Sequence, residues 1–286
     1  MKSKSLHINH LLEINLAMLF ISTSGALGRY VELAVPATIA SRAGLAFLFL
    51  LFYCKWKKIS FHIAKKDRFV LFLGGIFIGI HWVAYFYALQ LSNVAIGMLS
   101  MFTYPIITAL LEPLILKTPF QRIHLVLGLL VLGGIYLLAP DLDSGNPHIF
   151  AVGLGVFSAL AYAIRNIILK SRAAHYNGSM MMTYQTGIVG FILAPAFFIY
   201  DVEAISDQWP ALLTLALFTT AIGHTLFLNC FKHFSITTVS IISSVQPVYG
   251  ILIGMVFLSE IPNWTTVAGG VLILSSVVIE SIRSYK

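Results

Sequence analysis

Three charged side chains, Arg42, Glu112 and Arg165, interrupt long apolar stretches of the sequence and are its strongest candidates for chemistry. If these stretches cross a membrane, a charge near their middle costs at least about 2.5–3.5 kcal/mol to insert, so a charge kept there marks a functional site. Glu112 and Arg165 lie at similar depths, and we expect Glu112 to face Arg165 or a shared cavity. The alternative is an arginine that extends to the membrane surface and a glutamate at the interface.

Glu112, His81 and His224 are the groups that could exchange protons. If burial disfavours its charged form, Glu112 could take up a proton, and proton coupling is a hypothesis that rests on this residue. Each histidine could donate to a ligand or titrate near neutral pH, or could be a hydrogen-bonded packing residue. Both are too isolated from cysteine, aspartate and other histidines to predict a metal site, and no cofactor is predicted.

Aromatic and amide side chains accompany these groups and could line a central binding pocket. Tyr85 follows His81 by one helical turn, which places both on one helix face. The further candidates are Trp82, Tyr104, Tyr162, Gln185, Asn229, Gln246 and Tyr249. Apolar and aromatic walls with a few polar groups are typical of pockets for amphipathic small molecules. Each aromatic residue alone could equally be ordinary packing.

Pro105 and Pro247 lie near the middle of two apolar stretches. A proline inside a helix removes one hydrogen bond and frees a backbone carbonyl. In a membrane this is tolerated where a neighbour or a cavity satisfies the carbonyl. We therefore predict hinges at both prolines beside the binding pocket, with a passive packing kink as the alternative.

Composition indicates that the apolar stretches lie in a membrane. Of the residues, 58% are apolar and 10% are charged, and the mean hydropathy is +0.89. A soluble protein would have roughly a quarter of its residues charged. The net charge is +7, but the basic residues form no patch interleaved with aromatic residues, so no nucleic-acid partner is expected. The expected surroundings are a lipid bilayer.

The sequence contains ten apolar segments long enough to cross a hydrocarbon core about 30 Å thick. They are predicted near residues 11–29, 36–54, 69–89, 94–116, 122–139, 149–170, 181–200, 209–230, 237–258 and 263–282. All should be helices, because no alternation of period two is visible and backbone groups in lipid must be satisfied internally. The predicted fold class is an all-α integral membrane protein with ten transmembrane helices.

Basic residues predict the orientation of these helices. Most of the 18 lysines and arginines lie at the N-terminus, in segment 55–68, in the later even-numbered connections or at the C-terminus. By the positive-inside rule both termini are expected in the cytoplasm, with the chain in the cytoplasmic (inner) membrane. The first span also resembles a signal peptide, but its removal would put the remaining spans out of step, so we expect it to be retained.

The two halves of the chain resemble each other. A shift of 142 residues places Tyr104-Pro105 on Gln246-Pro247 and Gly128 on Gly270 without a gap. Nearer the front of each half, weaker matches place Arg29 on Arg165 and Arg42 on Gln185, and these require a gap. Two repeats of five helices follow, at 1–140 and 148–286. An odd number of spans makes the second repeat inverted, as in many secondary transporters.

These features resemble the drug/metabolite transporter superfamily, specifically its EamA-type members. The resemblance rests on the proline positions of the repeat, the segment Leu258–Pro262 and the glycine-bearing final helix of each half. It implies carriers, mostly exporters, of amino acids, metabolites, nucleotide-like compounds or drugs. Family members commonly have a glutamate after the fourth helix of each half. Here Glu260 occupies that place in the second half, but the matching first-half residue is Thr118.

The function expected from the sequence is therefore export of amino acids or related small metabolites or drugs by alternating access. No enzyme signature is present, so the chain is not expected to be an enzyme. The alternative is a non-transporting membrane protein, either a membrane-embedded enzyme or a sensory or structural subunit. The spacings Gly75-x-x-x-Gly79 and Gly250-x-x-x-Gly254 fit close helix packing within one chain or between two, so monomer and homodimer both remain open.

Overall fold

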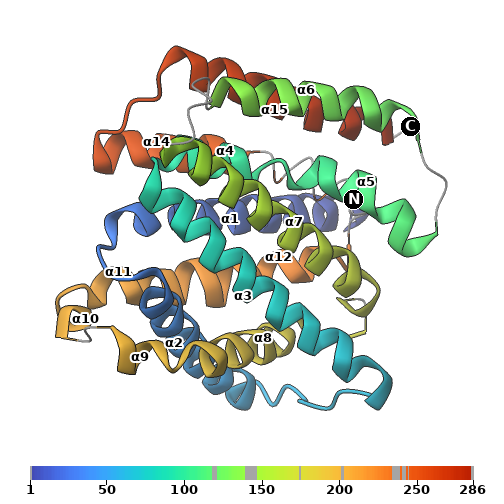
Figure 1. Cartoon of the computed structure of the whole chain (residues 1–286). Helices are drawn as coiled ribbons and strands as arrows, with labels where there is room; N and C mark the ends of the chain where they lie inside the picture. Colours follow the sequence, from blue (N-terminus) through green and yellow to red (C-terminus); the bar gives the residue numbers. More distant parts are fainter. Residues whose placement is uncertain are drawn as a thin grey trace.

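The computed structural model describes residues 2–117, 121–138, 147–173, 175–200, 203–233, 239, 243 and 245–284. Within these residues every regular element is helical (Figure 1). The elements are α1 (Lys2–Tyr30), α2 (Val35–Trp56), η1 (Lys65–Asp67), α3 (Arg68–Leu91), α4 (Val94–Met101), α5 (Tyr104–Leu116), α6 (Ile123–Leu138), α7 (Pro147–Ala173), α8 (Gly178–Leu193), α9 (Ala196–Ile199), α10 (Glu203–Asp207), α11 (Trp209–Thr214), η2 (Leu215–His224), α12 (Thr225–Cys230), α14 (Gln246–Leu258) and α15 (Trp264–Ser284).

Six of the described helical segments are long and apolar enough to cross a membrane. They are Val35–Trp56, Lys65–Leu91, Val94–Leu116, His148–Lys170, Gly178–Ile199 and Trp209–Cys230. Three shorter apolar helices follow, at Ile123–Leu138, Gln246–Leu258 and Trp264–Ile279. The all-α membrane fold predicted from the sequence is therefore confirmed. Much of the first half of the predicted span 237–258 lies outside the described residues.

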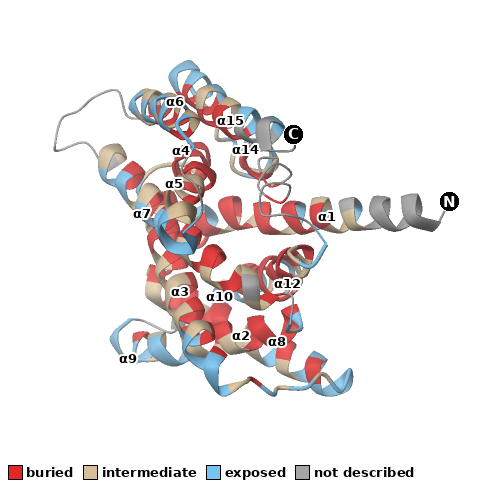
Figure 2. Cartoon of the chain, turned by 90° about the vertical axis from the view of Figure 1, so that its right-hand side faces the viewer, coloured by how far each residue is buried: buried red, intermediate tan, exposed pale blue. Residues whose placement is uncertain are grey.

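The helices pack around α1, which lies between η2 and α14. On one side α3 crosses α7 and packs on α8, while α2 packs along α8. On the other side α6 and α15 pair with each other at the top of the view and pack on α4 and α5 (Figure 1). The buried side chains concentrate where α1, α2, α3, α7, α8 and α12 meet (Figure 2). Two of the charged candidate residues, Arg42 and Arg165, lie in this central region.

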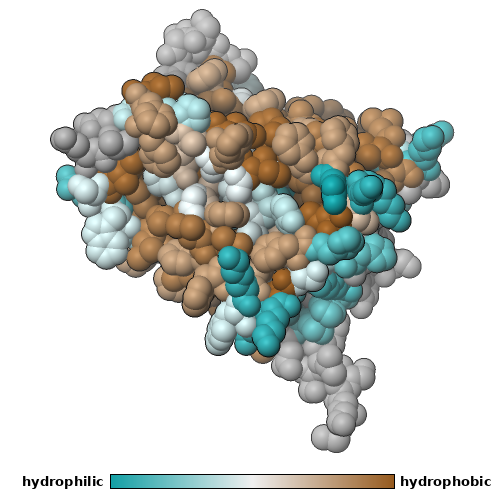
Figure 3. Space-filling view, turned by 90° about the horizontal axis from the view of Figure 1, so that it is seen from below, coloured by the Kyte–Doolittle hydropathy of each residue, from teal (hydrophilic) through white to brown (hydrophobic). Residues whose placement is uncertain are grey.

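The outer surface of the bundle is apolar. Large side chains such as Phe191 on α8 and Phe198 on α9 are 83% and 92% exposed. Seen from below, hydrophobic side chains cover most of the face and hydrophilic ones gather toward one side (Figure 3). An exposed apolar surface of this extent is expected against lipid and not against water.

Glycines allow the closest helix contacts. A Cβ on Gly134 of α6 would lie 2.8 Å from the carbonyl oxygen of Gly269 on α15, and a Cβ on Gly269 would lie 2.7 Å from the carbonyl oxygen of Gly134. Both positions therefore require glycine. Of the predicted small-residue motifs, Gly75 faces Ile188 on α8 and Gly254 faces Val94 on α4, so each packs within this chain.

A helix starts at each of the two prolines where the sequence predicted hinges. Between α4 and α5 the helix stops at Phe102 and Thr103, and Pro105 lies in the first turn of the new helix. Pro247 likewise lies in the first turn of α14. A first-turn proline removes no intrahelical hydrogen bond, so the prolines start helices and do not kink them. Whether these positions act as hinges stays a prediction.

Candidate functional site

Arg42 lies on α2 with 1% of its surface exposed. Its Nε donates to the hydroxyl of Thr220 at 2.6 Å. Its Cζ lies 4.3 Å from the centre of the Trp82 ring and 5.5 Å from that of Phe86, both on α3. Aromatic faces attract a cation, but they accept no full hydrogen bond from the remaining N–H groups.

Three buried side-chain nitrogens in this region have no hydrogen-bond partner among the described residues. They are Nη1 of Arg42, Nε1 of Trp82 and Nδ1 of His224. The ring centres of Trp82 and His224 lie 5.6 Å apart, and Arg42 lies over Trp82, so the three side chains form one cluster. Each residue is at least nine-tenths buried. A buried donor without a partner costs about 1–3 kcal/mol, and more when it is charged.

Arg165 on α7 is also fully buried, but its guanidinium is satisfied. Nε and Nη2 donate to Oε1 of Gln185 on α8 at 3.0 and 2.8 Å. Nη1 donates to Oδ1 of Asn166 at 2.9 Å, and Nη2 also contacts the sulfur of Met182 at 3.6 Å. Neutral acceptors therefore hold this charge in a fixed geometry, in contrast to Arg42.

His81 on α3 is held by Ser158 on α7. The hydroxyl of Ser158 donates to the carbonyl of His81 at 3.1 Å, and Nδ1 of His81 lies 2.8 Å from the same hydroxyl oxygen. Nδ1 also lies 3.3 Å from the backbone carbonyl oxygen of Ser158, which can only accept, so Nδ1 is the donor. A neutral His81 therefore presents Nε2 as an acceptor.

Aromatic rings connect the two arginines. The Tyr162 ring stacks on His81 at 4.5 Å and meets Tyr104 edge-on at 5.0 Å. The Cζ of Arg165 lies 5.8 Å from the centre of the Tyr162 ring. On the other side Tyr85 stacks on His81 at 5.9 Å. The structure brings these predicted side chains together, and their role as a binding site stays a prediction.

The buried groups around Arg42 and Arg165 carry positive charge, and no described carboxylate pairs with either arginine. The charges of Arg42 and Arg165 both act on His81 and on His224. Within the described residues, no group of three or more histidine, cysteine, aspartate or glutamate side chains could hold a metal ion.

Four predicted site residues make contacts other than with the two buried arginines. Of the two places expected for Glu112, beside Arg165 or at a shared cavity, the first is not observed, because Glu112 pairs with Lys170 at 3.4 Å and is 28% exposed; the second stays a prediction. Asn229 accepts from the backbone N–H of Gly178 at 3.2 Å and so helps to hold the start of α8. Gln246 is buried, and its backbone carbonyl accepts from Ser22 at 3.1 Å. Tyr249 is half-buried and packs against the main apolar core.

The sequence did not single out Thr220, Ser158 or Asn166, although each bonds to a charged or ionisable residue of the site. Thr220 lies in η2, a π-helix of ten residues in the middle of an otherwise α-helical span. Its hydroxyl donates to the carbonyl of Leu215, five residues earlier, and accepts from Arg42. Short π-helical segments occur frequently at functional sites. The adjacent pair Thr219-Thr220 was the available sequence signal.

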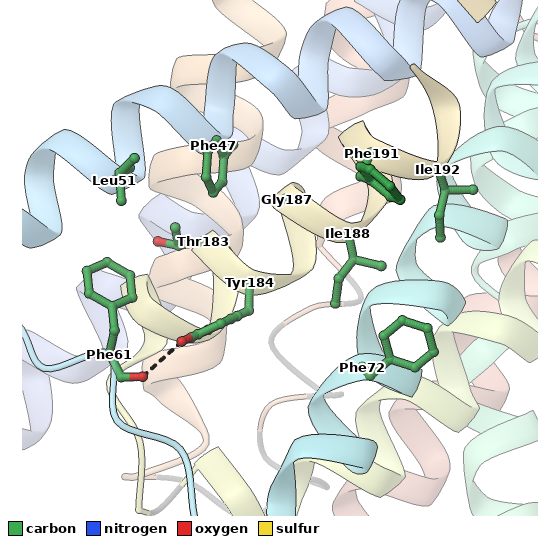
Figure 4. A pocket seen from close by; sticks show the side chains of 10 residues that line it. All are labelled: Phe47, Leu51, Phe61, Phe72, Thr183, Tyr184, Gly187, Ile188, Phe191 and Ile192. Atoms are coloured by element: carbon green, nitrogen blue, oxygen red, sulfur yellow. Dashed lines mark hydrogen bonds between the residues drawn. The ribbon is translucent and has the colours of Figure 1, made fainter. Parts of the chain in front are cut away.

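The grooves on the outside of the bundle differ from this site. One, of about 520 Å³, lies along α8 between α2 and the start of α3 (Figure 4). Its lining is almost entirely apolar, and the hydroxyl of Tyr184 donates to the carbonyl of Phe61, another lining residue, at 2.9 Å (Figure 4). Phe72 and Phe191 at its rim are exposed. This groove suits lipid chains and offers no polar recognition.

Ion pairs hold the helices together at both ends of the bundle. At one end Arg29 of α1 pairs with Glu260 at 3.0 Å, and Glu260 also accepts from the N–H of Val94 at the start of α4. At the other end Arg172 of α7 pairs with the buried Asp67 at 2.8 Å.

Tyr176 strengthens the contact around Asp67. Its hydroxyl donates to Asp67 at 2.8 Å, and this bond raises the pKa of Tyr176. The same hydroxyl accepts from the N–H of Ala64, which ties the link before α3 to the end of α7. The link, α3 and α7 are therefore joined at this end.

The family model of EamA-like transporters matches residues 11–139 and again residues 149–282. The chain belongs to this family. The sequence-based resemblance to EamA-type members of the drug/metabolite transporter superfamily is confirmed. The EamA-like match covers nearly the whole chain and occurs once in each half.

Several similar EamA-like proteins are exporters by name. Pseudopaline exporter CntI of Pseudomonas aeruginosa (strain UCBPP-PA14) is 24% identical over 261 residues, which cover 91% of each chain. Threonine/homoserine exporter RhtA of Escherichia coli (strain K12) is 25% identical over 228 residues, 79% of this chain and 74% of its own. One crystal structure superposes with a TM-score of 0.71 at 15% identity, over 97% of this chain and 99% of the other, which shows likeness of fold.

Proposed function

We propose that this protein exports small organic molecules across the cytoplasmic membrane by alternating access around the cluster of Arg42, His81 and Arg165. The observation that carries the proposal is the buried polar cluster at the centre of an apolar bundle. Two arginines at such depth are costly to insert, and a charge that is kept despite this cost marks a functional site. The exporter names of several relatives favour transport over the alternative of a non-transporting membrane protein.

The helix packing supports ten spans in two inverted repeats. Exchange of the halves relates α1 to α7, α2 to α8, α3 to the span of α11, η2 and α12, α5 to α14, and α6 to α15. Each of these contacts has a counterpart in the exchanged half. The contact of α3 with α7 corresponds to that of η2 with α1, and the contact of α3 with α8 corresponds to that of η2 with α2. The contact of α5 with α7 corresponds to that of α14 with α1. The pairs α2–α8 and α6–α15 map onto themselves. Such a pattern is expected from a two-fold axis through the bundle.

The helix bounds repeat as well. α5 and α14 both have 13 residues, and both end at a residue in the left-handed conformation, Lys117 with φ 56° and Ser259 with φ 57°. α2 and α8 begin at Val35 and Gly178, a shift of 143 residues. That shift places Arg29 on Arg172, both ion-paired near helix ends, and not on the buried Arg165. These correspondences support repeats at 1–140 and 148–286.

Alternating access requires that the two ends open in turn. The ion pairs at Glu260 and at Asp67 close opposite ends of the bundle, and the central cluster between them is buried. The basic link between α2 and α3 lies at the Asp67 end, so the positive-inside rule favours a cytoplasmic location for this end and for both termini. The solute would enter there and leave past Glu260.

Efflux from cells tests this function. Cells expressing the protein would be loaded with labelled amino acids, organic acids, nucleosides or cationic dyes, and the loss of label would be followed. We expect faster efflux of one class with the wild type, and loss of that efflux in Tyr162→Ala, which removes the ring between His81 and Arg165. Tyr136→Ala, at an exposed position of α6, is the matched control and should keep wild-type efflux. No efflux of any class by a membrane-inserted wild type would overturn the proposal.

A further inference from the structure

The two buried arginines of the central cluster are not equivalent. Arg165 has its donors directed to Gln185, Asn166 and Met182, whereas Arg42 has one side-chain hydrogen bond, to Thr220. Repeat symmetry makes the difference informative, because a shift of 143 residues places Arg42 on Gln185. In the second half Gln185 accepts hydrogen bonds from Arg165. In the first half the equivalent residue is Arg42, an arginine with no such amide acceptor among the described residues.

The nitrogens left without a partner among the described residues belong to three side chains that contact one another in sequence, Arg42 on Trp82 and Trp82 on His224. Nη1 of Arg42, Nε1 of Trp82 and Nδ1 of His224 come from α2, α3 and the end of η2. The ring contacts hold them together, since Arg42 stacks on Trp82 at 4.3 Å and Trp82 meets His224 at 5.6 Å. Nδ1 of a neutral histidine can carry the proton, so one charged and two neutral N–H groups are available.

We propose that these three groups bind the carboxylate of the exported solute, an inference that rests on the proposed function. A carboxylate has two oxygens with several lone pairs and can accept from all three donors. Its bond to the guanidinium is charge-assisted and about twice as strong as a neutral one. A phosphate ester has more oxygens and more charge than the three donors match.

The same cluster is unfavourable for an ammonium group. Arg42 and Arg165 both contribute positive charge, and no described carboxylate reaches them. An amino acid would therefore leave its ammonium without a charged partner. The solute class that fits is a monocarboxylate with net negative charge and an apolar or planar body, which would pack on Tyr85, His81 and Tyr162. The rate of transport should be lower for neutral alcohols, lower still for zwitterions and lowest for amines.

The order of these solutes can be measured with an isosteric series. Purified full-length protein would be reconstituted in liposomes and loaded with labelled 3-phenylpropionate, 3-phenylpropanol, phenylalanine, 3-phenylpropylamine or phenyl phosphate. We expect release of 3-phenylpropionate to be at least tenfold faster than release of the amine or the zwitterion, after subtraction of protein-free leak. Equal rates for carboxylate and amine would overturn the proposal, and preference for phenyl phosphate would overturn its carboxylate assignment.

Variants of the donors give the second readout. Arg42→Gln keeps a donor near Thr220 but removes the charge, and roughly a tenfold or greater loss of 3-phenylpropionate transport is expected. Trp82→Phe keeps the ring under Arg42 and removes only the N–H, so a smaller loss is expected. Trp209→Phe, at an exposed position on α11, is its matched control. Unchanged carboxylate selectivity in Arg42→Gln would contradict the assignment.

A binding measurement separates failure of this inference from failure of the proposed function. If no probe is transported, the export proposal fails, and the melting temperature of the detergent-solubilised protein then decides the inference. Stabilisation by 3-phenylpropionate but not by 3-phenylpropylamine, and its loss in Arg42→Gln, would support a carboxylate site in a protein that does not export these probes. Stabilisation by neither compound would overturn it.

Discussion

At the scale of single residues, Gln185 determines whether the charge of Arg165 can stay buried. Its Oε1 accepts two of the arginine's hydrogen bonds. Gln185→Leu removes this acceptor from a buried cation, and we expect a loss of about 2 kcal/mol in the free energy of unfolding. Thermal denaturation in detergent measures it. Gln185→Glu is the matched control, because it supplies a carboxylate and should be at least as stable as the wild type. Equal stability of wild type and Gln185→Leu would contradict this role.

Some residues of the site could be predicted from the sequence, and others could not. Arg42, His81 and Arg165 were predictable because a charge or an imidazole in an apolar segment has few structural explanations. Thr220 and Ser158 were not, since hydroxyls in membrane helices usually bond to their own backbone. Of the two places expected for Glu112, the one beside Arg165 is not observed, because depth along a helix does not fix which neighbour a side chain faces.

At the scale of helices, Asp67 joins the start of α3 to the end of α7 through Arg172 and Tyr176. Asp67→Asn removes the charge of this contact, and we expect the end to open more often. Cys54 and Cys230 are buried free cysteines near the same end, so the rate of thiol labelling in native membranes reports the opening. Labelling should become severalfold faster. Glu112→Gln, which breaks the half-exposed pair with Lys170, is the control and should have little effect.

Helix bounds could be predicted well, whereas their internal breaks could not. Apolar length alone located α2, α3 and α7 to within a few residues, because the bilayer fixes how much of a helix must be apolar. The π-helix η2 depends on the contact of Thr220 with Arg42, a residue far away in the sequence. The stop at Phe102 was predicted from Pro105 as a bend, but local sequence did not show that the helix would end and restart.

At the scale of the whole molecule, a substitution that opens one end of the bundle more often should keep the other end closed more often. Alternating access makes opening of the two ends mutually exclusive, so a change that favours one open state lowers the population of the other. Glu260→Gln weakens the pair with Arg29 and the contact with the start of α4. We therefore expect slower labelling of Cys54 and Cys230 at the far end, opposite to the effect of Asp67→Asn. Combining both changes should return the rate toward that of the wild type.

Independent fraying of the two ends predicts a different result. Glu260→Gln would then leave cysteine labelling unchanged, and the double variant would behave like Asp67→Asn alone. Glu32→Gln is the matched control, because this exposed carboxylate lies near Arg29 in the link between α1 and α2. It should label like the wild type in either case. Slower labelling in Glu260→Gln, absent from Glu32→Gln, would arise only if the two ends are coupled through the helices that carry the central cluster.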